Sequence, residues 1–411
     1  MFRISQLVLM AALATGFVGN AASAANLKND DLYKQAVDSK PELIKLLERL
    51  VNIDSGTGSE KGLDAVGAIV GDELMKLGMR VDLLSAAPAV GHNLVATLTG
   101  TGKAKILLMA HMDTVFADGT AKARPFRIEG DRAYGPGVMD NKGGIVTAIY
   151  ALKLLRQMKF TNFAKITLMV NTNEETFSKG TRGLIESLAK QNDVVLSMEP
   201  GRAADGLVIW RKGAGELLIE VTGKSAHAGV APDSGRNAAM EAAHQMLQMA
   251  SLGESSKLTT VNFTVINSGD RTNTIPNSAT VRGDVRVLEM TEFDRVEKGM
   301  AHLAEKKLIA ETVVKTSLIR GMSPMQINAG TEALAQRAQA IYGELGLKLT
   351  MEGSGGAGDA NYSSAAGTAS LDGFGIVGGN IHTEKEYAEL NSIAPRLYLL
   401  TKMLIDLSNS K

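Results

Sequence analysis

The chain has 411 residues, of which 45% are hydrophobic and 21% charged, which is the composition of a globular protein long enough for two domains. Lysine plus arginine and aspartate plus glutamate number 44 each, and aromatic residues make up 4%. This balance disfavours nucleic acid or an anionic membrane as the main partner. Because the sequence contains no cysteine, any metal site would have to use histidine, aspartate and glutamate.

Residues 1–24 have the pattern of a secretory signal peptide. Arg3 precedes an apolar stretch over residues 7–18, and Ala22-Ser23-Ala24 forms a small-residue cleavage site. The alternative is a membrane anchor, but the apolar stretch is short for a span. We therefore expect cleavage after Ala24 and a periplasmic or secreted protein with no membrane partner.

The next part of the sequence predicts an α/β domain. Helical periodicity covers residues 41–52, 60–77 and 143–158, and apolar strand patterns cover 105–110, 165–171 and 194–198. Continuous apolar strands that alternate with helices are typical of a largely parallel sheet with both faces covered. We assign residues 25–213 to the first part of a catalytic domain.

The pattern changes near residue 214, after which the predicted strands alternate apolar and polar residues. The predicted order is a strand at 215–223, a helix at 237–251, strands near 261–265 and at 278–287, a helix at 291–308 and a strand at 312–319. This β-α-β-β-α-β order predicts an inserted α+β ferredoxin-like domain over residues 214–323. Residues 324–411 would then complete the catalytic domain.

Polar side chains follow the predicted strands of the catalytic domain. Since ligands bind beyond the carboxyl ends of strands in such sheets, these side chains are candidates for one site. They are His111, Asp113, Glu174, Glu175 and Glu199, together with Asp140 before a helix and His382 near the C-terminus.

Each of these candidates has an ordinary structural alternative: a hydrogen-bonded histidine, a solvated acidic turn, or a helix cap. Taken together, they place two histidines and several carboxylates on one rim. Burying that much negative charge without a cation would be very costly. A pair of divalent metals removes this cost, and zinc accepts imidazole and carboxylate ligands.

The same residues lie in motifs that resemble a known family. The stretches "HMDTV", "GPGVMDNKGG", the paired "EE", "SMEP" and "IHTEKE" are similar, in the same order, to those of di-zinc metallopeptidases that include glutamate carboxypeptidases, aminoacylases and succinyl-diaminopimelate desuccinylase. The resemblance covers the whole mature chain. The stretches "LVNIDSGTGSEKG", "GKSAHAG" and "YLLTKMLIDL" resemble in particular the secreted carboxypeptidase G group.

The resemblance implies two zinc ions per subunit, with cobalt or manganese as alternatives. His111 and Glu199 would bind one zinc, and His382 and Glu175 would bind the other. Asp140 would bridge the two ions.

The resemblance also implies two catalytic roles beside the metals. Asp113 would orient His111 through the other ring nitrogen, and Glu174 would be the general base. We expect Glu174 and Glu175 on an extended segment, where neighbouring side chains point in opposite directions.

The inserted domain supplies three further candidates by the same resemblance. His227 would reach the active site of a dimer partner and stabilise the tetrahedral oxyanion, which implies a homodimer. Asn273 and Arg286 would hold the free carboxylate of the substrate. The alternatives are a surface-loop histidine and an ordinary cross-strand ion pair of Arg286.

Three positions depart from the family pattern. Gly358 stands where a serine or threonine is usual, and Asn173 where an aspartate is frequent. Met322 occupies a place where the carboxypeptidase G group carries a second arginine, a candidate for recognising the side-chain carboxylate. Met322 at this position argues against glutamate specificity more than against the hydrolytic chemistry.

The sequence therefore predicts a zinc-dependent hydrolase that releases a C-terminal amino acid, with glutamate as the first choice, from a small N-acyl, peptidyl or folate-like substrate. An N-acyl-amino-acid hydrolase or dipeptidase with another preference is the alternative within the same chemistry. A non-catalytic binding protein of the same fold, or an assembly protein whose inserted domain only dimerises, is the alternative in another class.

Overall fold

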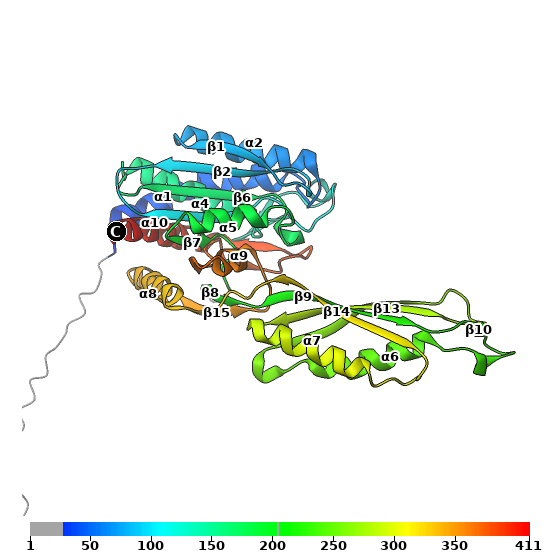
Figure 1. Cartoon of the computed structure of the whole chain (residues 1–411). Coiled ribbons are helices and arrows are strands. Elements are labelled where there is room, and N and C mark those ends of the chain that lie inside the picture. The colour runs from blue at the N-terminus through cyan, green and yellow to red at the C-terminus, as the bar shows by residue number, and fades with distance from the viewer. Residues whose placement is uncertain (1–27, 204) are drawn as a thin grey trace, which may run out of the picture.

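The computed structural model describes residues 28–203 and 205–411, so the predicted signal peptide lies outside the described residues. The described chain forms a large α/β body and a smaller elongated domain that extends from it (Figure 1). No helix within the described residues combines the length and apolarity needed to cross a membrane.

A six-stranded sheet organises the body, with the strand order β1-β2-β6-β3-β7-β16. Strands β6, β3, β7 and β16 run parallel to one another, whereas β2 is antiparallel to both β1 and β6. The prediction of a largely parallel central sheet is confirmed. The strands are β1 Arg80–Ser85, β2 His92–Thr99, β3 Lys105–His111, β6 Lys165–Asn171, β7 Val194–Ser197 and β16 Ala369–Leu371.

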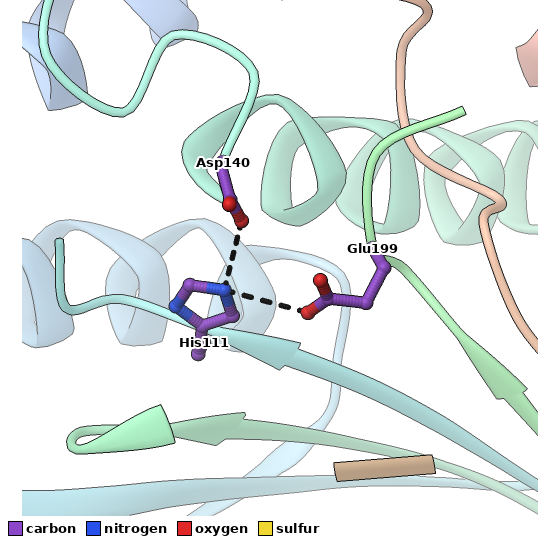
Figure 2. Close-up of side chains that lie close together, drawn as sticks. All are labelled: His111, Asp140 and Glu199. Atoms are coloured by element: carbon purple, nitrogen blue, oxygen red, sulfur yellow. Dashed lines mark hydrogen bonds and ion pairs between the residues drawn. The ribbon is translucent and has the colours of Figure 1, made fainter. Parts of the chain in front are cut away.

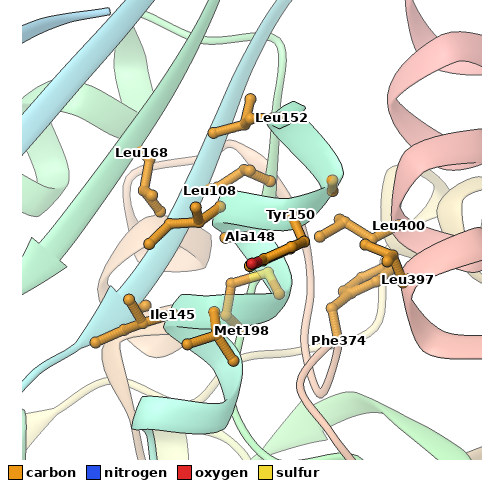
Figure 3. Packing of buried hydrophobic residues seen from close by; sticks show 14 of the residues in the cluster. Leu108, Ile145, Ala148, Tyr150, Leu152, Leu168, Met198, Phe374, Leu397 and Leu400 are labelled. Carbon is orange, nitrogen blue, oxygen red and sulfur yellow. The ribbon is translucent and has the colours of Figure 1, made fainter. Parts of the chain in front are cut away.

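Helices cover both faces of this sheet. One face carries the larger core, where α4 packs between the sheet and α10 through Leu108, Ile145, Leu397 and Leu400 (Figure 3). The opposite face packs against α5 and α9. Strand β3 is buried after its first residue, as expected for a central strand covered on both sides. The helices of the body are α1 Asp30–Val51, α2 Glu60–Lys76, α3 Thr120–Ala123, α4 Lys142–Gln157, α5 Arg182–Lys190, α8 Ala329–Gly343, α9 Asp359–Ala365 and α10 Ile393–Asn409.

Two small sheets complete the body. One pairs β8 and β15 in parallel, and the other has the order β17-β18-β5-β4. The second sheet brings the C-terminal segment beside the chain that precedes α4, because Tyr387 pairs with Tyr134. The strands are β4 Arg127–Glu129, β5 Arg132–Tyr134, β8 Gly206–Arg211, β15 Thr350–Ser354, β17 Gly378–Gly379 and β18 Tyr387–Glu389.

The elongated domain has the predicted β-α-β-β-α-β order. Its four-stranded antiparallel sheet has the order β11-β13-β9-β14, and its own apolar core joins the sheet to α6 and α7. The ferredoxin-like prediction is therefore confirmed, while the domain boundaries stay predictions. The elements are β9 Gly213–Thr222, α6 Ala238–Met249, β11 Thr260–Ser268, β13 Ser278–Val287, α7 Met290–Ala304 and β14 Val313–Met322, with β10 Ala226–His227 and β12 Thr274–Ile275 paired in a separate small ladder.

Candidate active site

The site begins at the carboxyl ends of three neighbouring parallel strands. Strand β3 ends on His111, which pairs with Asn171 at the end of β6, while Met109 pairs with Ser197 at the end of β7. Glu199 follows β7 two residues later, and Glu174 follows β6 three residues later. The strand register therefore delivers the polar residues to one edge of the sheet, as the sequence predicted.

His111, Asp140 and Glu199 form the first group (Figure 2). Nε2 of His111 lies 3.1 Å from Oδ1 of Asp140 and 3.4 Å from Oε1 of Glu199. His111 is 1% exposed and Asp140 6%. One imidazole nitrogen and two carboxylate oxygens thus converge on a single buried point.

Asp140, Glu175 and His382 form a second group that shares one carboxylate with the first. Nε2 of His382 lies 3.3 Å from Oδ2 of Asp140 and 3.2 Å from Oε2 of Glu175. Asp140 therefore presents one oxygen to each histidine. The structure brings together the five residues predicted as metal ligands, in the predicted pairing.

This donor set fits divalent metal ions. Each group offers one imidazole and two carboxylates, which suits zinc and also manganese or cobalt. Oε1 of Glu175 is buried and has no hydrogen-bond partner among the described residues, which is the situation of an oxygen that a cation would satisfy. The residues are therefore compatible with two metals, although their number and identity remain proposals.

The charges of the protein's own groups are strongly coupled at this point. Burial lowers the pKa of His111, but its contacts with Asp113, Asp140 and Glu199 outweigh burial and raise that pKa well above its usual value. Hydrogen bonds with Asp140 and Glu175 raise the pKa of His382 to about 10. Burial and the neighbouring Asp140 raise the pKa of Glu199. Both histidines thus have surroundings that favour a positive charge, which is what a cation site demands.

Asp113 orients more of the site than the prediction required. Nδ1 of His111 lies 3.0 Å from the main-chain oxygen of Asp113 and 3.3 Å from its Oδ1. The same carboxylate accepts hydrogen bonds from the main-chain N–H groups of Glu174, at 3.0 Å, and Glu175, at 3.2 Å, and from the Thr57 hydroxyl at 2.6 Å. A single buried carboxylate therefore positions both a histidine and the turn that carries the two glutamates.

The local geometry predicted for the two glutamates is wrong. Glu174–Thr176 is a 3₁₀ turn rather than an extended segment, because the Asp113 carboxylate accepts hydrogen bonds from the first two N–H groups of that turn. The two side chains still differ in surroundings. Glu175 contacts His382, whereas burial first and the neighbouring Glu199 next raise the pKa of Glu174 well above its usual value.

Two buried side chains beside the site were missed by sequence reasoning. Arg211, at the end of β8, places Nη2 3.7 Å from Oε2 of Glu199 and donates from Nε to Asp372. Glu386 is 1% exposed and accepts hydrogen bonds from the loop that carries Asp140. Arg211 had a usable signal, since it ends the apolar strand "GLVIWR" just as the predicted ligands end theirs.

The three candidates of the inserted domain lie away from both groups. His227 belongs to β10 at the far end of that domain (Figure 1), and Asn273 lies beside it, since its main-chain oxygen accepts from Ala228. Arg286, on β13, donates from Nε to both oxygens of Asp284 at 3.0 and 2.9 Å. This ion pair runs along one strand rather than across two. Within the single chain, none of the three contacts the predicted ligands among the described residues.

The three departures have distinct structural settings. A Cβ at Gly358 would meet Oε1 of Glu174 at 3.3 Å, so a side chain there would press against the predicted base. Asn173 accepts from the Thr181 hydroxyl and donates to Lys179, which fixes the turn. Met322 is 2% exposed and packs in the apolar cluster between sheet and helix, so it offers no charge to a ligand.

Comparisons with known proteins agree with this geometry. The pattern of peptidase family M20/M25/M40 matches residues 107–406. The chain belongs to this family. It is thus a metallopeptidase, as the sequence predicted, and the family resemblance is confirmed.

Individual relatives of this M20 family member cover nearly its whole length. It is 38% identical to Carboxypeptidase G2 of Pseudomonas sp. (strain RS-16) over 99% of both chains. It is 27% identical to succinyl-diaminopimelate desuccinylase of Gluconobacter oxydans (strain 621H) over 87% of this chain and 95% of that one. Among solved structures, a tripeptidase from Staphylococcus aureus superposes with a TM-score of 0.77 at 22% identity, covering 90% of this chain and 99% of that one. The last similarity shows the fold.

Proposed function

We propose that the protein is a di-zinc carboxypeptidase that hydrolyses the amide bond to a C-terminal amino acid, with glutamate as the first choice, in N-acyl, peptidyl or folate-like substrates. One observation carries the proposal: two groups of one histidine and two carboxylates share Asp140 beyond the strand ends, and the half-buried Glu174 lies beside them. A shared carboxylate between two such groups is a donor arrangement for a pair of metals.

His111, Asp140 and Glu199 would hold one zinc, and Asp140, Glu175 and His382 the other. When bound, the ions would polarise the scissile carbonyl and activate the attacking water. The protein supplies the orientation of these ligands, since Asp113 fixes both His111 and the turn of Glu174 and Glu175.

Glu174 would move the proton that hydrolysis requires. Its carboxylate takes a proton as the oxygen of water bonds to the carbonyl carbon, and it delivers that proton to the nitrogen as the C–N bond breaks. The products are the carboxylate of the acyl part and the free amine of the released amino acid. A raised pKa suits Glu174 to this exchange, because it lies closer to the operating pH.

Full-length similarity to Carboxypeptidase G2 supports release of a C-terminal residue. Arg286 would hold the carboxylate of that residue, in competition with its present partner Asp284. The proposed homodimer would bring His227 into the site of the partner subunit. Its Nδ1 accepts N–H groups of Gly229 and Val230, at 3.2 and 3.1 Å, which leaves Nε2–H as a donor for an oxyanion in a partner's site.

A cavity of about 350 Å³ favours the second candidate, a hydrolase with an apolar preference. It lies between Phe177, just beyond the glutamate turn, and the sheet of the inserted domain, where Val265 and Ile319 line it. Arg282 is the one cation among its described lining residues, and it is already paired with Glu216. A glutamate side chain would have to compete with Glu216 there, whereas an apolar side chain would not.

The deciding experiment is an assay of the zinc-loaded mature protein on folate and on matched N-acyl-Glu, N-acyl-Asp and N-acyl-Leu. We expect Glu174→Ala to lower kcat by about 10²–10⁴-fold, the usual contribution of a general base, with two zinc ions still bound. The exposed Glu332→Ala is the matched control and should keep full activity.

The substrate series separates the two candidates. Preference for N-acyl-Glu supports glutamate release, and preference for N-acyl-Leu supports the apolar alternative with the same mechanism. Equal activity of Glu174→Ala would contradict the mechanism. A protein that binds zinc and every ligand offered but turns over none would indicate a binding protein.

Export is part of the same proposal. We expect the N-terminus of protein recovered from the periplasm or medium to be Ala25, as read by N-terminal sequencing. Recovery of a chain that begins at Met1 would contradict it.

A further inference from the structure

Glu386 connects two segments that the proposed metal site needs in fixed relative positions. It is buried, and it stands at the end of the loop that carries His382, directly before β18. Strand β18 pairs with β5, and the loop that follows β5 leads to Asp140. The pairing of Tyr387 with Tyr134 thus places Glu386 against the Asp140 loop.

The side chain of Glu386 holds that loop by its main chain. Oε1 accepts hydrogen bonds from the N–H groups of Met139, at 2.9 Å, and Asp140, at 3.0 Å. Oε2 accepts from the N–H of Gly137 at 3.0 Å. Three donors from one four-residue segment on one buried carboxylate leave that segment little freedom.

The main chain of Glu386 forms a hydrogen bond within the other segment, which carries His382. Its N–H donates to the oxygen of Thr383 at 3.2 Å, and the N–H of Thr383 donates to Asn380 at the same distance. His382 therefore lies inside a short turn that ends on Glu386. One residue fixes the turn of one predicted ligand through its backbone and the loop of another through its carboxylate.

We propose that Glu386 is a positioning residue that sets the separation of His382 and Asp140, and thereby tunes zinc affinity. The proposal rests on the proposed metal site. The Glu386 carboxylate bonds main-chain N–H groups and none of the predicted ligand atoms, so its effect would reach the metals through the placement of Asp140 and His382.

The test is a zinc titration of apo-protein in competition with a chromophoric chelator, which gives stoichiometry and affinity without an activity assay. Glu386→Ala should weaken zinc binding about 10–100-fold, the usual effect of removing a partner that orients a ligand. Glu384→Ala is the matched control, because Glu384 is an exposed glutamate of the same loop, and it should bind zinc like the wild type.

A second variant guards against loss of folding. Glu386→Gln keeps the size of the side chain and one acceptor oxygen but replaces the other with an N–H₂ group, which cannot accept from the loop. We expect a smaller loss of zinc affinity than in Glu386→Ala, with an unchanged circular dichroism spectrum.

The outcomes separate the two proposals. If Glu386→Gln and folded Glu386→Ala both bind two zinc ions with wild-type affinity, the positioning role of Glu386 is overturned. The proposed metal site would still stand. A wild-type protein that binds no zinc in the titration would instead overturn the proposed metal site and this inference with it.

Discussion

Polar residues at the strand-end site differ in burial and in contacts from those at the far end of the inserted domain. At the strand ends, His111 and Asp140 are buried and each contacts two or more charged neighbours. At the far end of the inserted domain, His227 and Asn273 are exposed, and their contacts are with nearby loop atoms. The contrast indicates that the fold of one chain is enough to bring the predicted metal ligands together, whereas the proposed roles of His227 and Asn273 would need a second subunit.

Metal removal is expected to have the largest effect, and we expect it to change the strand-end site but not the inserted domain. Exhaustive chelation should lower activity by about 10³-fold or more, since metals contribute several kcal/mol to such reactions. Hydrogen exchange should rise at the strand ends and in the loop of His382 but stay unchanged in α6 and α7. Equal changes in both regions would contradict the assignment of the metals to the strand ends.

Mixing two inactive variants tests whether the inserted domain acts in a partner subunit. His227→Ala should lower kcat by about 10²–10³-fold, the usual cost of losing an oxyanion donor. Mixing it with Glu174→Ala and allowing subunit exchange should restore up to about a quarter of wild-type activity, because half of the dimers are then mixed and each has one complete site.

The measurement is activity against time after mixing, with wild type diluted into Glu174→Ala as the exchange control. Full activity of His227→Ala by itself, or of a protein shown to be monomeric by sedimentation, would remove the inserted domain from the chemistry.

The smallest expected effect concerns acid stability of the inserted domain. Hydrogen bonds from Arg295, and then from Lys257 and Thr259, lower the pKa of Glu292 to about 2 despite its burial. Because the folded pKa lies below the unfolded one, this stabilisation is present above about pH 4.5 and is lost as the pH falls towards 2. Glu292→Gln should therefore cost about 1–3 kcal/mol at pH 7 and little near pH 2.

Hydrogen exchange of α6, α7 and β11 at both pH values measures that difference, and the exposed Glu289→Gln is the control. A loss of protection in the body instead, or an equal loss at both pH values, would contradict the ion-pair explanation.

The sequence predicted the parts of the fold and site that depend on strand ends. Apolar runs located β3, β6 and β7, and the rule for parallel sheets then placed His111, Glu175 and Glu199 on one rim. These predictions need only the direction of the strands. They do not need any particular contact between side chains.

Predictions failed where a distant contact decides the local conformation. The 3₁₀ turn at Glu174 exists because Asp113, 61 residues earlier, accepts its N–H. The helix expected from residue 291 to 308 ends at Ala304, where Gln248 of α6 donates hydrogen bonds to the main-chain oxygens of Leu303 and Lys306. Neither contact has a signature in the local sequence. The role of Glu386 was missed for the same reason, since its partners lie about 250 residues away.

Asp140 is shared by the two groups, and the pairing of β3, β6 and β7 sets the spacing of the other strand-end residues. A change at Asp140 or in the register of the sheet would therefore affect both groups at once. The inserted domain has its own apolar core and is free of this coupling. Under the proposed function, substitutions at cavity-lining residues such as Arg282 and Ile319 would change the recognised amino acid and leave the proposed metal ligands in place.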